Sequence, residues 1–311
     1  MILSVTLNPC LDKTLNVPAW TLGENVRGTA LREVVGGKGN NVARALKRLG
    51  RDARPVTFLG GEIGRLCERL LRDEDGLEPV AISTVSPTRV ILTTRTASNE
   101  QTAFFDPNPS IRPEEAHALL HEVETRLRSG TVEALTLSGS SPHPSTHGLF
   151  GELIGLAKAR RVPVFLDTYG PSLDAIWGFR PDFQQFNRRE AALSMGLIRA
   201  DDSAVERVLQ DWSKRGVKVG IVTDGPSPAL ARWEGATYRV IPPEIVAVNP
   251  IGSGDCLLAG LVDGLLLGGS YELIVRRGIA SAVANALVWD AGAIDPGDVE
   301  RIEPLIRIEP L

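Results

Sequence analysis

The chain has 311 residues, of which 43% are hydrophobic, and this is enough apolar material for one large α/β domain or two smaller ones. The composition excludes a disordered chain, because disorder requires low hydrophobicity together with high net charge. Its 34 Lys and Arg against 38 Asp and Glu give a formal net charge of −4, so nucleic acid is not expected as a partner and anionic ligands need local positive sites.

Apolar, β-branched runs alternate with helical patterns along nearly the whole chain. The predicted strands are residues 2–7, 55–59, 133–137, 162–167, 182–186 and 217–223. Apolar residues recur at helical spacing between them, in residues 41–49, 62–71, 113–128, 147–160 and 203–214. Two further helices, 255–267 and 273–289, are apolar nearly all round and should be buried. This alternation predicts right-handed βαβ units, hence a mainly parallel sheet with helices on both faces.

A second group of strands breaks this alternation. Residues 31–35, 88–96 and 102–105 are predicted strands, and the last two follow each other too closely for a crossover, so they should be antiparallel. They could form a small separate sheet that covers one edge of the main domain as a lid or as a dimer surface. Residues 107–113 (PNPSIRP) are either a hinge or an ordinary surface loop. We expect a single domain over residues 1–311, with lid strands within about 12–36 and 87–106.

The cysteines and the apolar runs indicate the cellular compartment of the protein. Cys10, Cys67 and Cys256 lie far apart without metal-ligand spacing, as expected in a reducing cytoplasm. The opening residues lack the basic and apolar segments of a signal peptide. The most apolar run, 256–267, is too short to span a bilayer. We therefore predict a cytoplasmic protein without a membrane partner.

The strongest local motif is NPIGSGD at residues 249–255, directly before an apolar helix. Gly252 and Gly254 allow a sharp turn that points successive N–H groups outward, and the helix adds its positive end. Such a site suits charge that develops on a phosphoryl group. Asp255 lies in the first helical turn and is a candidate general base for a substrate hydroxyl. The alternative is an Asp that caps a buried helix behind a glycine turn.

A second glycine loop, VGGKGNN at residues 35–41, connects a strand to a helix. It lacks the spacing of a Walker A loop, so ATP would have to be bound without a P-loop. Lys38 offers a point charge for phosphate, and Asn41 can form hydrogen bonds with sugar hydroxyls. The alternative is an exposed Lys in a tight turn.

Together these two glycine motifs, in this order and about this far apart, resemble the two signatures of the ribokinase-like (PfkB) carbohydrate kinases. The similarity covers essentially the whole chain. The opening LNPCLDKT (7–14) resembles the NPxxDKT start of the phosphosugar branch, which contains 1-phosphofructokinase, the minor 6-phosphofructokinase and tagatose-6-phosphate kinase. The resemblance implies a ribokinase-like α/β fold, a mainly parallel central sheet flanked by helices and a small β-sheet lid. It also implies ATP and Mg²⁺ as cofactors and a ketohexose phosphate as substrate. We expect a homodimer formed through the lid.

The resemblance also implies a role for individual residues. The residues implied to contact the sugar phosphate are Asp12, Gly37, Lys38, Asn41, Arg89 and Ser138. Arg89 would bind the phosphate itself, since a guanidinium can bond two phosphate oxygens at once. Glu190, with Asn187, matches the NxxE motif linked to Mg²⁺ and triphosphate, and oxygen ligands of this kind suit a hard cation. Nucleotide contacts are implied for Asn187, Thr223, Asp224, Gly225 and Gly254. Asp255 matches the catalytic base, with Gly252, Ser253 and Gly254 as the anion hole.

Three positions depart from the family pattern. Gln185 stands where the branch usually has a lysine that approaches ATP, which puts ATP affinity or turnover in question. Pro226 and Pro228 replace a more open glycine-rich stretch at the expected adenine site. Cys256 replaces a small Ser or Ala after the catalytic position, which should matter little because Cys behaves as a small buried residue.

Two other functions remain open at the level of sequence. One is a kinase of an uncharged sugar or a nucleoside, against which Arg89 and Lys38 argue. The other is a sugar-phosphate-binding regulator with weak catalysis, suggested by Gln185. The presence of both Asp255 and Glu190 favours the enzyme.

Overall fold

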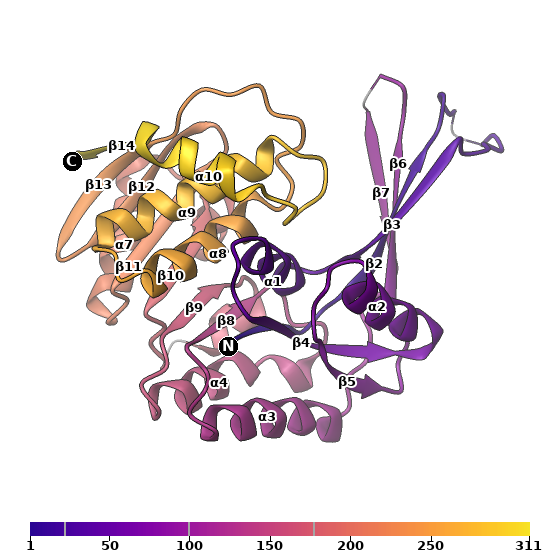
Figure 1. The fold of residues 1–311 in the computed structure, drawn as a ribbon, viewed down its shortest axis with the longest axis horizontal. Helices are drawn as coiled ribbons and strands as arrows, with labels where there is room; N and C mark the ends of the chain where they lie inside the picture. The colour runs from indigo at the N-terminus through magenta and orange to yellow at the C-terminus, as the bar shows by residue number, and fades with distance from the viewer. Residues whose placement is uncertain (22, 99, 177) are drawn as a thin grey trace.

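The computed structural model describes residues 1–21, 23–98, 100–176 and 178–311. Figure 1 shows a large body of strands and helices from which a small, separate sheet projects at one side. The two sheets share no strand, and their strand orders are β14-β13-β12-β11-β10-β9-β8-β1-β4-β5 and β3-β2-β6-β7.

The large sheet is parallel over most of its width. Its parallel strands are β1 (Ile2–Thr6), β4 (Ala53–Gly60), β5 (Val80–Thr84), β8 (Ala134–Ser138), β9 (Val164–Asp167), β10 (Phe183–Asn187) and β11 (Val219–Asp224). An antiparallel extension continues one edge through β12 (Ser227–Trp233), β13 (Ala236–Ile241) and β14 (Arg307–Pro310). The predicted mainly parallel sheet is confirmed.

Helices cover both faces of this sheet, and each face has its own apolar core. One core receives buried side chains from α1 (Lys38–Arg48), α2 (Gly61–Asp73), α8 (Ser253–Leu266), α9 (Tyr271–Ala286) and α10 (Pro296–Ile302). The other receives them from α3 (Pro113–Arg128), α4 (Leu149–Lys158), α5 (Pro171–Ala175), α6 (Arg188–Ser194) and α7 (Asp202–Lys214). The helices α8 and α9 are buried along most of their length, as their all-round apolar pattern predicted. Two short 3₁₀ turns, Pro144–Thr146 and Glu303–Leu305, complete the helical structure that is described.

The small sheet consists of β2 (Cys10–Asn16), β3 (Ala30–Gly36), β6 (Arg89–Arg95) and β7 (Gln101–Phe105). The strands β6 and β7 are antiparallel, as predicted from their close spacing. The central pair β2 and β6 is parallel, and β3 pairs antiparallel with β2 on its other side. The strand β2 was not predicted, because residues 7–14 were interpreted only as a motif.

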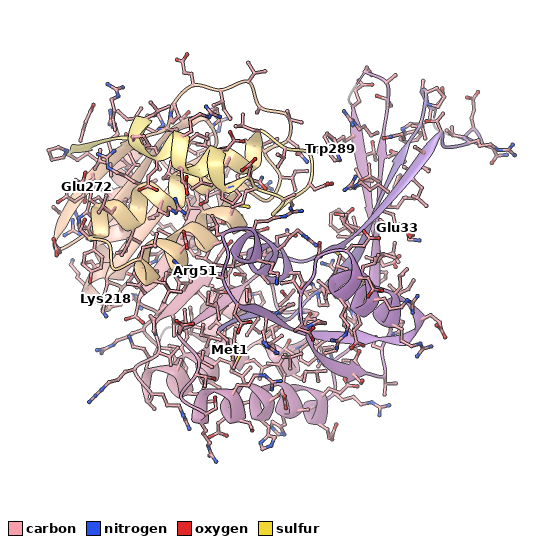
Figure 2. All side chains as sticks on the ribbon, viewed as in Figure 1. Met1, Glu33, Arg51, Lys218, Glu272 and Trp289 are labelled. Atoms are coloured by element: carbon pink, nitrogen blue, oxygen red, sulfur yellow. The ribbon has the colours of Figure 1, made fainter. Side chains whose placement is uncertain are left out.

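The small sheet touches the body near Trp289, whose place beside it is labelled in Figure 2. The guanidinium carbon of Arg95 on β6 lies 3.9 Å from the centroid of the Trp289 ring. Arg32 on β3 forms an ion pair with Asp290, the next residue of the same loop. Two contacts from different strands therefore connect the small sheet to the loop before α10.

Polar side chains collect at the carboxyl ends of the parallel strands, on the face that α1 and α8 cover. In β9 and β10 this face is apolar at Phe165 and Phe183, whose rings stack with centroids 4.3 Å apart. Two residues further along each strand the same face presents Asp167 and Gln185, because side chains alternate along a strand. Ligands in open α/β sheets bind outside the carboxyl ends of the strands, at the point where the strand order reverses. In this sheet the strand order reverses between β1 and β8.

The structure shows the state of the three cysteines and the length of the apolar helices. All three cysteines are free and buried. Within the described residues, no helix combines the length and the apolar character needed to cross a membrane.

Candidate active site

A cavity of about 1080 Å³ opens at the carboxyl edge of the large sheet and reaches the small sheet. Most of the predicted site residues line it, although they come from segments far apart in the chain. These residues are Asp12, Gly37, Lys38, Asn41, Arg89, Asn187, Glu190, Thr223, Gly225, Gly252, Ser253, Gly254 and Asp255. Ser138 and Asp224 do not line it. Ser138 is fully buried at the end of β8, and Asp224 forms an ion pair with Arg188, with 3.0 Å between Oδ2 and Nε.

The first turn of α8 places a buried carboxylate at one end of this cavity. Gly252 has φ = 86°, a left-handed conformation that suits glycine, and this turn starts the helix directly after residues 249–251. Asp255 follows in the first turn with only 5% of its surface exposed. The amide nitrogen Nδ2 of Asn41 donates a hydrogen bond of 2.7 Å to its Oδ2. Burial raises the pKa of Asp255 to about 7, and nearby Lys38 opposes this rise. A carboxyl group with this pKa can accept a proton near neutral pH.

Lys38, the first residue of α1, connects two carboxylates from different strands and helices. Its Nζ lies 2.9 Å from Oδ1 of Asp167 and 3.3 Å from Oε1 of Glu190. The ring centroid of Tyr169 is 5.2 Å away. Burial alone would lower the pKa of Lys38, but the carboxylates of Asp167, Glu190 and Asp255 raise it overall, so the amine stays charged. The ammonium therefore compensates the charge of a group of acidic side chains at the cavity, a role that was not predicted for it from the sequence.

Arg89 provides a positive charge at the other end of the cavity, where the small sheet begins. Its Nη2 and Nε donate to the carbonyl oxygens of Asn8 and Pro9, at 3.3 and 3.4 Å. Among the residues that are described, no carboxylate forms an ion pair with it, so its charge is available to an anionic ligand. Asp12 on β2 lies in the same region, and burial raises the pKa of its carboxyl group.

Asn187 and Glu190 form a capping box at the start of α6. The side chain of Asn187 accepts from the backbone N–H of Glu190 at 2.8 Å, and Oε2 of Glu190 accepts from the N–H of Asn187 at 2.9 Å. Burial raises the pKa of Glu190, and the charge of Asp167 adds to this effect. The NxxE pattern thus has a structural role here, which leaves Oε1 of Glu190 facing Lys38.

Gln185 lies beside the glycine turn, at the position where the family pattern has a lysine. It is 2% exposed, and no described residue donates a hydrogen bond to its Oε1. A side chain added at Gly254 would meet Nε2 of Gln185 at 3.2 Å, which shows how closely the amide approaches the turn. An unpaired buried oxygen is costly, so this atom is ready to accept a ligand or a water.

Several residues at the site were missed by sequence reasoning. Asp167 is the clearest. It is buried next to the cavity, where it forms an ion pair with Lys38, and its place at the end of a predicted strand was a signal that pointed to it. Asn8, Arg44 and Tyr169 line the cavity, but their single-residue signals do not differ from those of ordinary loop and helix residues.

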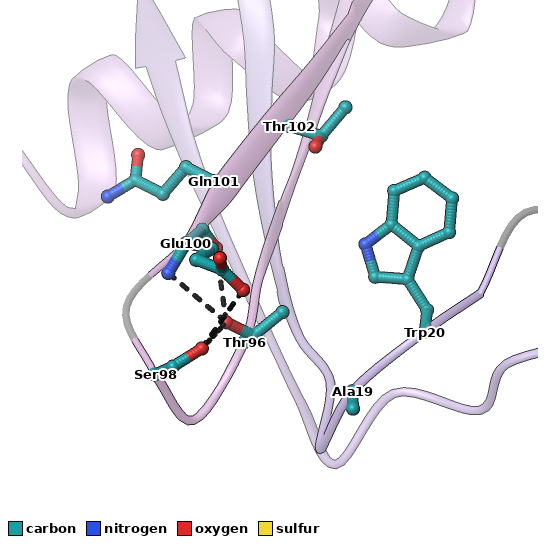
Figure 3. Close-up of a pocket in the computed structure, with 7 residues that line it drawn as sticks. All are labelled: Ala19, Trp20, Thr96, Ser98, Glu100, Gln101 and Thr102. Carbon is teal, nitrogen blue, oxygen red and sulfur yellow. Dashed lines mark hydrogen bonds between the residues drawn. The ribbon is translucent and has the colours of Figure 1, made fainter.

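A second, smaller cavity of about 450 Å³ lies at the far end of the small sheet (Figure 3). Its side chains include Trp20, Thr96, Ser98 and Glu100, and the last three form hydrogen bonds with one another. None of the residues predicted for catalysis or binding lines it, so it is a poor candidate for the site.

The comparisons with known proteins identify the family of the chain. The family described as pfkB family carbohydrate kinase matches residues 5–297. The chain belongs to this family. It is therefore a carbohydrate kinase, and the resemblance of its glycine motifs is confirmed.

Solved structures agree with this membership in fold. Escherichia coli phosphofructokinase-2 in complex with potassium superimposes with a TM-score of 0.89 at 25% identity, over 98% of both chains. A Thermotoga maritima protein described as a possible 1-phosphofructokinase gives 0.87 at 21% identity, over 100% of this chain and 99% of that one. A carbohydrate kinase from Agrobacterium tumefaciens gives 0.74 at 22% identity, over the same shares. The ribokinase-like fold that the sequence implied is thus shown.

Proposed function

We propose that this PfkB kinase transfers the γ-phosphoryl group of ATP to a hydroxyl of a ketohexose phosphate and so forms a sugar bisphosphate. Fructose 1-phosphate, fructose 6-phosphate and tagatose 6-phosphate are the candidate substrates. The observation that carries this proposal is the placement of Asp255 and Arg89 in one cavity, a buried carboxylate at one end and a cation outside any described ion pair at the other. Escherichia coli phosphofructokinase-2, 25% identical to this chain, has been solved with fructose 6-phosphate, and this supports the choice of substrate class.

In this mechanism Asp255 accepts the proton of the attacking hydroxyl. Its pKa of about 7 suits the task, because a base must be ionised at working pH and still basic enough to take a proton. The backbone N–H groups of residues 252–254 and the positive end of α8 would stabilise charge on the transferring phosphoryl group. Arg89 would hold the phosphate of the sugar and thereby orient its free hydroxyl toward Asp255.

The donor set at α6 fits a hard cation. Within the described residues, no group of three or more His, Cys, Asp or Glu side chains is placed to coordinate a metal ion by itself. Mg²⁺ prefers oxygen ligands, keeps several waters and usually binds together with substrate phosphates. Glu190 and Asn187, which both line the cavity, are oxygen donors of this kind, and they would hold Mg²⁺ through its waters. Bound with the nucleotide, the ion would neutralise charge on the phosphate oxygens. We place the nucleotide along Asn187, Thr223 and Gly225, with Asp224 outside the cavity.

The small sheet would act as a lid and as the surface of a homodimer. All five residues of β7 are exposed, including Phe104 at 52% and Phe105 at 64%. Leu31 on β3 is also 55% exposed. Apolar side chains at this level of exposure on one sheet favour a partner surface, and a second copy of the chain fits the proposal best. The cytoplasmic location remains a prediction.

A panel of acceptors tests the proposed function. ATP turnover is measured with the three ketohexose phosphates and with free fructose and ribose, at equal concentrations. A phosphorylated sugar should exceed its free counterpart in kcat/KM by about one to two powers of ten, the contribution of a hydrogen bond to a charged group. Equal efficiency on fructose and its monophosphates would favour the kinase of uncharged sugars. Binding of a sugar phosphate without any turnover would favour the regulator, which the neutral Gln185 suggests.

A further inference from the structure

Arg44 is a buried cation of α1 that lines the cavity and contacts Asn41, the hydrogen-bond donor to Asp255. It is 7% exposed. Its Nε and Nη2 bind the carboxylate of Asp75 at 2.8 and 2.7 Å, and Nη2 also donates to the carbonyl of Val35 at 3.0 Å. Its Nη1 donates to the carbonyl of Ala291 at 3.0 Å and to Oδ1 of Asn41 at 2.9 Å. Every nitrogen of the guanidinium therefore has a partner.

The bond to Asn41 decides which end of that amide faces Asp255. An amide oxygen only accepts hydrogen bonds and an amide nitrogen only donates them, whereas a guanidinium can only donate. Arg44 must therefore face Oδ1 of Asn41. This leaves Nδ2 on the opposite side, where it donates to Oδ2 of Asp255 at 2.7 Å. With the amide reversed, N–H groups would oppose the guanidinium and an oxygen would oppose the carboxylate.

We propose that Arg44 is a positioning residue that holds Asn41 as a hydrogen-bond donor and so keeps Asp255 in its ionised, proton-accepting form. This inference rests on the proposed role of Asp255 as the base. It also changes the part expected of Asn41, because both ends of its amide are engaged within the protein and only one N–H remains for a sugar hydroxyl.

The groups around Asp255 set the direction of the expected effect. Burial, Asp167 and Glu190 raise the pKa of Asp255, while Lys38 and the hydrogen bond from Asn41 lower it. When Arg44 is removed, the amide of Asn41 is free to turn its oxygen toward Asp255. The pKa of Asp255 should then rise, with the other groups unchanged.

The test compares Arg44→Met with Lys47→Met, which removes an exposed cation from the same helix. The pH profile of kcat is measured for both variants and for the unmodified enzyme. In Arg44→Met the acid limb should move up by about one pH unit, as expected for the loss of one hydrogen bond to a charged group. The limb should stay in place in Lys47→Met. A lower melting temperature with an unmoved limb would show a merely structural role and overturn the proposal.

Two further variants keep the inference testable. If Arg44→Met does not fold, Asp75→Asn loosens the guanidinium while its carbonyl partners remain, and the limb should move in the same direction by less; no movement overturns the proposal. In an Asn41→Ala background, Arg44→Met should add no further shift, and an added shift would show that Arg44 does not act through Asn41. Unchanged turnover in Asp255→Asn would reject the base itself. An inactive Asp255→Asn beside an unmoved limb in Arg44→Met would reject the role of Arg44 alone.

Discussion

The ammonium of Lys38 lies 2.9 Å from Oδ1 of Asp167, at the point where α1 begins and β9 ends. Lys38 also reaches Glu190, so one cation links the loop that the sequence predicted for the sugar with the motif predicted for Mg²⁺ and triphosphate. The contact of Lys38 with a sugar phosphate stays a prediction. The geometry adds an electrostatic interaction of this one ammonium with three carboxylates, those of Asp167, Glu190 and Asp255.

This link predicts opposite shifts for two variants. Lys38 lowers the pKa of Asp255 and Asp167 raises it. The acid limb of the kcat profile should therefore move up in Lys38→Met and down in Asp167→Asn, by about one unit each. Profiles of both variants, recorded with saturating substrates, check this. A tenfold higher KM for the sugar phosphate in Lys38→Met without a moved limb would instead place Lys38 on the substrate.

The fold could largely be predicted from the sequence because most of its elements have a strong pattern. The buried parallel strands are continuous apolar runs, and the helices between them have regular apolar spacing. The antiparallel edge and the edge strand β5 were missed because polar residues interrupt their apolar runs. The hairpin of β12 and β13 turns at Glu234 and Gly235, both with positive φ, but this turn signal was not recognised.

The candidate site was predictable only where a motif marks it. The glycine motifs point to Asp255 and Lys38, because clustered glycines in a sequence indicate the sharp turns beside which these residues lie. Arg44 carries no such mark, and Asp167 is marked only by its place at the end of a predicted strand. Their importance comes from side chains that meet across the fold, Asp167 with Lys38 and Arg44 with Asn41, and sequence spacing contains no information on these contacts.

Replacing the proposed base, Asp255, tests the mechanism. In Asp255→Asn, turnover should fall by about 10²–10⁴, because the side chain keeps its size but cannot accept a proton. Steady-state kinetics on a folded preparation measures this. Turnover close to that of the unmodified enzyme would contradict the mechanism.

The same variant should change how stability depends on pH. Since burial raises the pKa of Asp255 from 3.8 to about 7, the folded state binds more protons than the unfolded state between these values. Stability of the unmodified protein thus falls as pH rises through this window. Asn resembles the protonated form and does not titrate. The melting temperature of Asp255→Asn, relative to that of the unmodified protein, should therefore rise by about a few °C between pH 5 and 8. A constant difference would mean that Asp255 is not buried as an ionisable group.

The selectivity for a phosphorylated sugar should depend on Arg89. Arg89→Ala should remove most of the advantage of the ketohexose phosphate in kcat/KM, about one to two powers of ten, and leave free fructose nearly unaffected. Arg48→Ala is a matched control, because it removes another cation that lines the cavity from a different element. Equal losses for both sugars in Arg89→Ala would indicate a structural role.

A homodimer formed through the small sheet predicts sensitivity to charge on β7. The double variant Phe104→Asp, Phe105→Asp should shift the mass measured by light scattering from dimer to monomer, since unpaired charges in an apolar interface are costly. Exposed Leu267 on the body provides the control, Leu267→Asp, which should leave the mass unchanged. A monomeric unmodified protein at micromolar concentration would contradict the dimer directly.

Gln185 predicts weak binding of the nucleotide in an otherwise competent enzyme. Its amide lies beside Gly254 without the positive charge that the family pattern supplies at this position. The unmodified protein should therefore have a comparatively high KM for ATP. Gln185→Lys should lower that KM while kcat stays similar, because an interaction that is equal in the ground and transition states changes KM alone.

The outcomes of this substitution separate the remaining functions. Gln185→Leu is the control, since it removes the unpaired Oε1 without adding charge, and it should not lower the KM for ATP. Unchanged constants in Gln185→Lys would mean that the phosphates are already neutralised by Mg²⁺ and the end of α8. If neither the unmodified protein nor Gln185→Lys turns over ATP with any sugar of the panel, although a sugar phosphate still binds, the proposed ketohexose-phosphate kinase is wrong. Gln185 would then mark a protein of this family that binds its sugar phosphate for regulation.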